Sequence, residues 1–373
     1  MNYEQAYRRL ISGESTGLMA AVSRIVLSAA AAVYSIIIRT RNFMYSKAIL
    51  KSYKVNAPVV SVGNITAGGT GKTPLVIWLC NQITKNPRFS IPNYGCAILT
   101  RGYKPIQSSK LNIQSYADEP VFLAQSCPEV KVIVNPDRVA AAAEVVEKFG
   151  AKVLIMDDGF QHRCLNRDLD IVTIDATCPF GYDKMLPAGL LREPLAELKR
   201  ADAVVITRCD QAREATLSQI EEKLQLTNQY MIIAKSVHKP VCAKSTDNRQ
   251  IGLEELRNKK IFAFCGIGNP DAFLWTIKGL DADVTGSKIY NDHHHYTEND
   301  IAEIYKQAKG LKVDLILTTQ KDWTKIIGEF QTSITDYHDV LFAYLAIELK
   351  FLAGQEKITQ LLKDTLSGKI SKK

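Results

Sequence analysis

Short apolar runs alternate with longer amphipathic segments along most of the chain. Apolar residues that recur every three to four positions predict helices at Lys72–Thr84, Arg138–Phe149 and Leu217–Leu226. Strands that alternate with helices are typical of a mostly parallel sheet with helices on both faces, so we expect an α/β fold. Runs rich in β-branched residues predict the strands of this sheet at Pro58–Val62, Ala97–Thr100, Val130–Val134, Val153–Met156, Asp170–Ile174 and Ala203–Thr207.

A second pattern begins after residue 229. Between Tyr230 and Lys244, two β-type runs flank a polar step at His238–Pro240, which suits a ribbon joining two lobes. We therefore expect a main domain over residues 41–229, a linking ribbon over 230–250 and a smaller C-terminal α/β lobe over 251–373. The expected elements of that lobe are strands at Ile261–Phe264 and Asp314–Thr318 and helices at Pro270–Leu280 and Glu298–Ala308.

Residues 1–40 contain an apolar segment that differs from the rest. Between Leu18 and Ile38 the only charged residue is Arg24. A spanning helix needs about 20 predominantly apolar residues, so this one is borderline for crossing a bilayer and long enough to lie in one leaflet. The alternative is a buried helix at the edge of the core. An anionic cytoplasmic membrane face is favoured by the basic residues that follow, Arg39, Arg41, Lys47, Lys51 and Lys54.

The bulk composition narrows the class of protein. With 373 residues, 46% hydrophobic and 23% charged, the chain is of ordinary globular type and long enough for two domains. Its formal charge of +8 suits phosphates, acidic lipids or nucleic acid without choosing between them. The eight cysteines have no metal-ligand spacing, which predicts reduced thiols in a cytosolic compartment. The polar first residues, Met1–Glu14, lack the order of a secretory leader.

A glycine-rich turn between the first strand and the first helix is the strongest motif. Such a turn places backbone N–H groups and a helix N-terminus around one anion, as a triphosphate requires. Lys72 would reach the β- and γ-phosphates, and the Thr73 hydroxyl would ligate Mg²⁺. Thr66 replaces the first glycine of the usual P-loop, and a chance glycine-rich turn is the alternative. The expected cradle consists of Thr66, Ala67, Gly68, Gly69, Thr70, Gly71, Lys72 and Thr73.

Two adjacent acids end a later apolar strand. Asp157 and Asp158 follow Val153–Met156, at the carboxyl end of a strand, where parallel sheets bind ligands. Neighbouring carboxylates repel each other unless a cation or proton intervenes, which favours Mg²⁺. An ordinary helix N-cap pair is the alternative.

These motifs together resemble one family, the tetraacyldisaccharide 4'-kinases, which are the lipid A 4'-kinases of Gram-negative bacteria. The resemblance runs from about residue 55 to about residue 325 and is far more specific than the cradle alone. The matching stretches are Ser61–Pro74, Thr100–Tyr103, Asp118–Pro120, Asp157–His162, Leu186–Pro194, Asp292–His294 and Thr318–Asp322.

The resemblance implies an ATP- and Mg²⁺-dependent kinase with a P-loop NTPase-like fold. Its substrate would be tetraacyldisaccharide 1-phosphate, which it would phosphorylate at the 4'-position to give lipid IV-A. The same likeness implies a location at the cytoplasmic face of the inner membrane, where the N-terminal helix would lie. We expect that membrane surface and the lipid as partners, with no nucleic acid and no obligate protein partner.

The family also implies a group that receives the proton of the attacking hydroxyl. That role would fall to Asp118, paired with His293, while Lys72 and Asp158 complete the catalytic set. A histidine beside an aspartate can orient it and tune its proton affinity. The alternatives are that Asp118 only starts a helix, with Pro120 in its first turn, and that His293 is a bystander.

Other motif residues are expected to contact substrate or nucleotide. His162 has the alternative of a structural imidazole, and Arg192 with Glu193 that of a surface ion pair. Lys321 and Asp322 are interpreted as lobe–lobe or nucleotide contacts. The residues predicted to bind substrate are Arg101, Tyr103, Gln161, His162, Arg192 and Glu193.

Two rival functions stay open at this point. The stretch Thr207–Asp210 faintly resembles a guanine-reading motif with Arg in the lysine position, as in a GTPase. A membrane-tethered ATP-binding module without catalysis is the other rival, although the Asp292–His294 cluster would serve no purpose there.

Overall fold

The computed structural model describes residues 3–87, 89, 95–101, 118–247, 249–335 and 339–369. The chain divides into two compact units. It passes from the first unit to the second within strand β7 (Ile232–Ser245) and returns within β12 (Leu341–Ala353). The first unit comprises Met1–Gln107, Leu123–Val237 and Lys350–Lys373, and the second comprises Ser108–Phe122 and His238–Leu349.

The first unit contains a parallel sheet with the strand order β7-β6-β5-β1-β4-β2-β3. Parallel sheets are covered on both faces, and this explains why the strands read as continuous apolar runs. The predicted strands are confirmed within one or two residues at each end. The strands are β1 (Val59–Asn64), β2 (Cys96–Thr100), β3 (Lys131–Val134), β4 (Val153–Asp157), β5 (Leu169–Asp175) and β6 (Ala203–Thr207).

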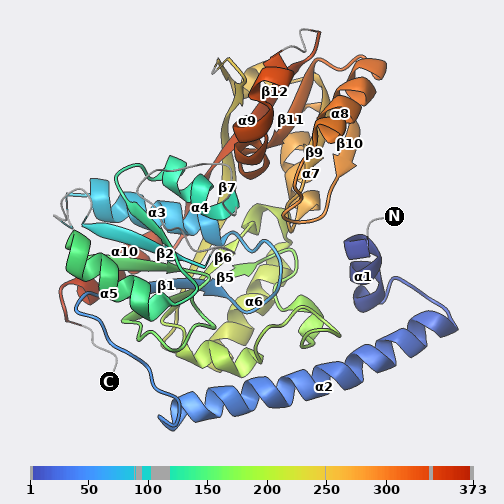
Figure 1. Cartoon of the computed structure of the whole chain (residues 1–373). Helices are drawn as coiled ribbons and strands as arrows, with labels where there is room; N and C mark the ends of the chain where they lie inside the picture. The colour runs from blue at the N-terminus through green and yellow to red at the C-terminus, as the bar shows by residue number, and fades with distance from the viewer. Residues whose placement is uncertain are drawn as a thin grey trace. The chain divides into compact units, whose positions relative to one another are not determined.

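Helices α3 (Lys72–Lys85) and α5 (Arg138–Phe149) lie on opposite faces of this sheet (Figure 1). Local signals fix the ends of α5. The Asp137 carboxylate accepts from the N–H groups of the first turn, and Gly150 ends the helix with a φ of 65°. The other helices are α4 (Asp118–Ser126), α6 (Glu214–Thr227) and α10 (Gln355–Leu366), with 3-10 turns at Gly181–Asp183, Leu195–Arg200 and Cys209–Gln211.

The chain begins with α1 (Tyr3–Ser12) and the 29-residue helix α2 (Leu18–Ser46). An 18-residue window of α2 has a mean hydropathy of 2.0, and only 11% of that window is buried. By length and composition α2 can cross a membrane. The low burial disfavours the alternative of a buried core helix, because such a helix would cover its apolar side chains with protein.

The second unit has the parallel strand order β10-β9-β11-β12. Its helices carry strong start signals: Asn269 caps α7 and Pro270 occupies the first turn, while Thr297 and Asp300 form a capping box at α8. The elements are β8 (Gln250–Ile251), a 3-10 turn at Leu253–Leu256, β9 (Lys260–Cys265), α7 (Pro270–Lys278), β10 (Asp283–Ile289), α8 (Glu298–Gly310), β11 (Leu315–Thr319) and α9 (Gln320–Thr335).

The predicted α/β class with a mostly parallel sheet is confirmed. The expected pair of runs around His238–Pro240 is wrong in detail, because β7 is one continuous strand. It pairs with β6 over Ile232–Lys235 and with β8 over Ala243–Lys244, and it also neighbours β12 in the sheet. The predicted domain limits stay a prediction, although the chain from Lys350 onward groups with the first unit.

Substitution of Gly63 by alanine tests the contact between β1 and the turn after β4. An added Cβ would lie 2.5 Å from Phe160 Cβ and 2.6 Å from its backbone nitrogen. We expect Gly63→Ala to lower the free energy of unfolding by about 1–3 kcal/mol in urea denaturation. Gly310→Ala is the control, since nothing lies within 4 Å of its added Cβ. Equal stabilities of the two variants would contradict this packing.

Candidate active site

The carboxyl ends of β1 and β4 bring the glycine-rich loop and the paired acids together. Val62 pairs with Asp157 in the parallel register, so the last residues of β1 lie beside the turn that begins at Asp158. The Gly159 N–H donates to Val62 O at 2.9 Å and ties the two turns to each other. The predicted convergence of the two motifs therefore rests on strand register.

A network of hydrogen bonds between hydroxyl and amide groups connects the glycine-rich loop to the neighbouring strands. Asn64 Nδ2 donates to Thr66 O at 2.7 Å and to Thr70 Oγ1 at 3.0 Å. Thr70 Oγ1 lies 2.8 Å from Thr173 Oγ1 on β5, and Thr207 Oγ1 donates to Thr70 O at 2.9 Å. These side chains are buried, and the hydrogen bonds between them fix the loop.

Arg208 fastens the same loop with a charge. Its Nη1 donates to Gly69 O at 2.9 Å and pairs with Asp175 Oδ2 at 2.5 Å. A buried ion pair with further hydrogen bonds orders its surroundings more than it adds stability. The stretch Thr207–Asp210, which suggested a GTPase, thus supports the loop through its first two residues.

The loop ends at the N-terminus of α3. Gly71 is the N-cap with a φ of 84°, a left-handed conformation that glycine adopts without strain. Because Gly71 has no side chain to cap the helix, the first-turn N–H groups face the loop side, together with the positive end of the helix dipole. Lys72 and Thr73 stand at this end.

Asp158 lies between two cations. Its Oδ1 is 3.3 Å from Lys72 Nζ, and Arg192 Nη1 donates to Oδ1 and Oδ2 at 3.1 and 3.0 Å. Burial disfavours the ionised carboxylate, but Lys72 and Arg192 outweigh this and lower the pKa of Asp158 to about 2. Asp158 also has a φ of 50°, which is uncommon for a non-glycine residue. Such backbone strain clusters at functional sites.

Asp157, Asp158 and Thr73 offer the oxygen ligands that Mg²⁺ prefers. Asp157 is 2% exposed and stands next to Asp158 at the strand tip. Among the described residues, no group of three or more His, Cys, Asp or Glu could hold a metal ion. This fits Mg²⁺, which takes one or two carboxylates, keeps several waters and shares phosphate oxygens. The donor set therefore fits a magnesium ion bound together with a nucleotide.

Gln161 and His162 make contacts inside the protein. Gln161 Nε2 donates to Asn64 O at 2.8 Å, which joins the acid turn to the end of β1. His162 Nδ1 lies 3.0 Å from Cys164 Sγ, and burial together with the charge of Arg138 lowers its pKa. A neutral imidazole at pH 7 agrees with the structural alternative for His162, and substrate binding by either residue stays a prediction.

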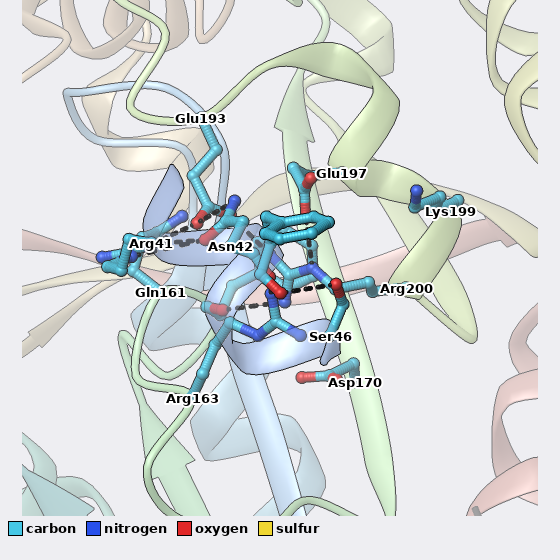
Figure 2. A network of polar contacts seen from close by, with 12 residues as sticks. Arg41, Asn42, Ser46, Gln161, Arg163, Asp170, Glu193, Glu197, Lys199 and Arg200 are labelled. Atoms are coloured by element: carbon cyan, nitrogen blue, oxygen red, sulfur yellow. Dashed lines mark hydrogen bonds and ion pairs between the residues drawn. The ribbon is translucent and has the colours of Figure 1, made fainter. Parts of the chain in front are cut away.

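Arg192 and Glu193 have different surroundings. Arg192 meets Asp158, whereas the Glu193 side chain is 0% exposed and contacts Arg41, Asn42 and Arg200 (Figure 2). The alternative of a surface ion pair between the two is wrong. The guanidinium of Arg192 contacts Asp158, and the carboxylate of Glu193 contacts Arg41 and Arg200. Substrate binding by Glu193 stays a prediction.

In the second unit, the Asp292–His294 turn separates the roles of its histidines. His293 has a φ of 60°, and its side chain is 49% exposed, with Nε2 3.8 Å from Asp292 Oδ2. Asp292 Oδ1 lies 3.7 Å from Lys321 Nζ. His294 instead stacks on Tyr290 at 4.3 Å between ring centroids. Its packed ring assigns His294 to structure and leaves His293 accessible.

Asp322 organises this turn from within the unit. It is 0% exposed and accepts from the Gly266 N–H at 3.0 Å and from Lys325 Nζ at 3.3 Å. Lys325 Nζ also donates to His294 O at 3.3 Å, and the His293 N–H donates to Gly266 O at 3.3 Å. The Thr318–Asp322 motif thus supports the histidine turn, while its predicted nucleotide or lobe contacts stay a prediction.

Three further predicted site residues are Tyr103, Asp118 and Arg101. Tyr103 lies outside the described residues, and so does the side chain of Asp118, whose backbone starts α4. Arg101 is exposed directly after β2. The roles of all three stay predictions.

The chain is similar to known proteins over most of its length. A family model described as tetraacyldisaccharide-1-P 4'-kinase matches residues 23–367. The chain belongs to this family. The tetraacyldisaccharide 4'-kinase of Halothermothrix orenii is 34% identical over 352 residues, 90% of this chain and 91% of the relative. The enzyme of the same name from Chlorobaculum parvum is 36% identical over 355 residues, 92% and 96% of the two chains.

A solved structure agrees with this assignment. The crystal structure of LpxK from Aquifex aeolicus in complex with ATP matches with a TM-score of 0.65 and 29% identity, covering 92% of this chain and 99% of that chain. The predicted family, that of the tetraacyldisaccharide 4'-kinases, is therefore confirmed.

Two arginines of this tetraacyldisaccharide kinase site escaped the sequence analysis. Arg208 fastens the loop, and Arg138 lies buried behind the acids, where its Nη2 donates to Asp157 O at 3.2 Å. Burial lowers the pKa of Arg138 to about 10, against the attraction of Asp157 and Asp158. Arg138 looked like the first residue of a helix, and only its place in an apolar segment hinted at burial.

The lowered pKa of Asp158 predicts how stability depends on pH. Since the unfolded carboxyl has a pKa of about 3.9, the stabilisation by Arg192 is complete above that value and is lost as pH falls toward about 2. We expect Arg192→Gln to be less stable than wild type in urea at pH 7, by a difference that shrinks at pH 3.5.

The control for this titration is Lys148→Gln, which removes one charge from an exposed pair with Glu144 and should change stability little at either pH. An Arg192→Gln difference that stays constant from pH 7 to 3.5 would refute the pairing.

Proposed function

We propose that this protein transfers the γ-phosphate of ATP to the 4'-hydroxyl of tetraacyldisaccharide 1-phosphate and so forms lipid IV-A in lipid A biosynthesis. Membership in the tetraacyldisaccharide-1-P 4'-kinase family supports the reaction and the substrate. The observation that carries the proposal is the meeting of Lys72, Asp158 and Arg192 at the N-terminus of α3. Such a cluster serves phosphoryl transfer, because catalysis there is mostly positioning and charge stabilisation.

The chain's own groups would divide the work at the phosphates. The N–H groups of the loop and of the first turn of α3 would bind the phosphate oxygens, and Lys72 would compensate the charge of the β- and γ-phosphates. Thr73, Asp157 and Asp158 would hold Mg²⁺, which neutralises charge on the phosphates when bound. Arg192 adds a second positive charge, because it contacts the same Asp158 carboxylate as Lys72.

We assign the proton of the attacking hydroxyl to Asp118 and His293. Of the triplet, His294 is packed between Tyr290 and Tyr296, while the His293 ring is half exposed beside Asp292. The exposed His293 ring is open to a bound acceptor, and a histidine in that position can take up a proton during transfer. The family resemblance supplies the pairing with Asp118.

We place the protein at the cytoplasmic face of the inner membrane, held there by α2. The support is the length of α2 and its exposed apolar side chains, among them Ile25, Val26, Ile36 and Ile37. A substrate with four acyl chains stays in the bilayer, so a kinase that acts on it gains from lying at the same surface.

The reaction is tested with γ-labelled ATP, Mg²⁺ and tetraacyldisaccharide 1-phosphate in detergent. We expect labelled lipid from the wild type and about 100-fold less or lower from each of two variants. Lys72→Ala loses the positive charge at the phosphates, and Asp158→Ala loses a carboxylate that would hold Mg²⁺. Lys223→Ala, which removes an exposed pair with Asp183, is the control and should keep wild-type turnover. Absence of labelled lipid with the wild type would leave the ATP-binding module as the better reading.

Membrane attachment is tested by charges on the exposed face of α2. Val26 and Ile37 are 62% and 59% exposed, and a glutamate at each would oppose insertion into lipid. We expect the Val26→Glu, Ile37→Glu double variant to bind anionic phospholipid vesicles roughly tenfold less or weaker, with unchanged unfolding. Leu226→Glu, at an 82% exposed leucine of α6, is the control. Binding equal to wild type in the double variant would exclude α2 as the anchor.

A further inference from the structure

Arg192 and Glu193 are neighbours in the chain that join two different parts of the first unit. The guanidinium of Arg192 contacts Asp158, which in turn contacts Lys72 of the phosphate loop. The carboxylate of Glu193 contacts the last turns of α2 through Arg41 and Asn42. One dipeptide therefore lies between the apolar helix and the phosphate site.

The contact with α2 is a buried charge network. Glu193 Oε1 accepts from Arg41 Nη2 at 2.5 Å and from Asn42 Nδ2 at 3.3 Å, and Oε2 accepts from Arg200 Nη2 at 2.5 Å (Figure 2). Glu193 is 0% exposed and Asn42 is 3% exposed. A buried carboxylate needs its partners, since loss of one leaves an uncompensated charge. The network therefore fixes α2 against the segment that carries Arg192.

Arg163 widens this attachment to the turn after the paired acids. Its Nη1 donates to Asn42 O at 3.0 Å, and its guanidinium lies 5.2 Å from the centre of the Tyr45 ring. Arg200 also lies 4.1 Å from the centre of the Phe160 ring, in the same turn as Asp158. The C-terminal part of α2 is thus bound to both segments that meet at Asp158.

The backbone of Arg192 is held from two sides as well. Its N–H donates to Ile65 O of the phosphate loop at 2.7 Å, and its carbonyl accepts from the Tyr34 hydroxyl of α2 at 3.0 Å. Ala67 N–H donates to Leu190 O at 2.7 Å and continues the pairing between the two segments. The backbone of Arg192 is therefore held by α2 on one side and by Ile65 on the other, and the guanidinium reaches Asp158 from this held backbone.

We propose that Tyr34 and Glu193 are positioning residues through which the apolar helix α2 holds Arg192 on Asp158, so that attachment of α2 sets the rate of phosphoryl transfer. The inference rests on the proposed function, because it concerns the same site. It goes beyond anchoring, since a helix that only anchors would affect access to lipid and not the placement of Arg192. It identifies the C-terminal half of α2 as part of the kinase unit.

Tyr34→Phe is the sharpest test, because it deletes one hydroxyl and keeps the ring. In the full-length protein, with γ-labelled ATP and tetraacyldisaccharide 1-phosphate, we expect kcat to fall about threefold to tenfold, the range for one lost hydrogen bond. Binding to anionic phospholipid vesicles should stay at the wild-type value, and the urea midpoint should fall only by the small amount of one lost hydrogen bond, so that the protein stays fully folded in the assay. Tyr45→Phe is the matched control on the same helix, since its contact with Arg163 uses the ring and survives loss of the hydroxyl.

A double-mutant cycle separates positioning from a merely structural role. If Tyr34 acts by placing the Arg192 guanidinium, Tyr34→Phe should change kcat less than twofold, in round terms, in an Arg192→Gln background. A full additional loss in that background would overturn the proposal. Glu193→Gln, which keeps a side-chain oxygen for Asn42 but lowers the charge that holds Arg41 and Arg200, should show the same dependence on Arg192.

The outcomes keep the two hypotheses apart. Absence of labelled lipid with wild-type protein would defeat the proposed function itself. If the wild type is active, a kcat of Tyr34→Phe equal to that of the wild type would defeat only the role of α2. An equal fall of kcat in Tyr34→Phe and Tyr45→Phe would do the same. Reduced turnover of Tyr34→Phe together with reduced vesicle binding would also count against it, because anchoring alone would then explain the loss.

Discussion

The charge of Asp158 is the interaction on which the site depends. One carboxylate at the tip of a buried strand is held between Lys72 and Arg192, and the attraction overcomes the cost of partial burial. Lys72 starts α3 and Arg192 follows the segment paired with the loop, so the carboxylate connects three parts of the first unit. Its left-handed backbone is tolerated because these contacts over-determine its place.

Two further buried charges near the site also have fixed partners. Arg208 pairs with Asp175 and holds the loop, while Arg138 lies behind the acids and bonds to a carbonyl of the strand. Such pairs add little net stability, but removal of one partner is costly, so each restricts the geometry of its neighbours. The glycine-rich loop is in this way held by contacts with β5 and with the turn after β6.

Much of this could be predicted from the sequence. The strands and helices of the first unit were located by periodicity, because parallel strands buried on both faces read as continuous apolar runs. The loop and the paired acids could be predicted because both follow the carboxyl ends of apolar strands, where parallel sheets bind ligands. The motifs also identified the family, which the comparisons confirm.

The contacts between distant segments could not be predicted. Arg208 and Arg138 carry no local signal, since their partners Gly69 and Asp157 are set by strand order and register. Strand β7 continues through Pro240 because it is paired with β6, β8 and β12 along its length, and the pattern of hydrophobic residues does not record these partners. The histidine triplet was ambiguous for the same reason: only packing against Tyr290 distinguishes His294 from His293.

The dipeptide of Arg192 and Glu193 shows what this limit means for function. The sequence places the two residues side by side and suggests that they pair with each other. In the fold they have separate partners, one at the phosphate site and one on a helix that begins at Leu18. Glu193 is buried among Arg41, Asn42 and Arg200, whereas the partly exposed Arg192 side chain contacts Asp158, so the two neighbours do not neutralise each other. Their adjacency then transmits the placement of α2 to Asp158 through a single peptide bond.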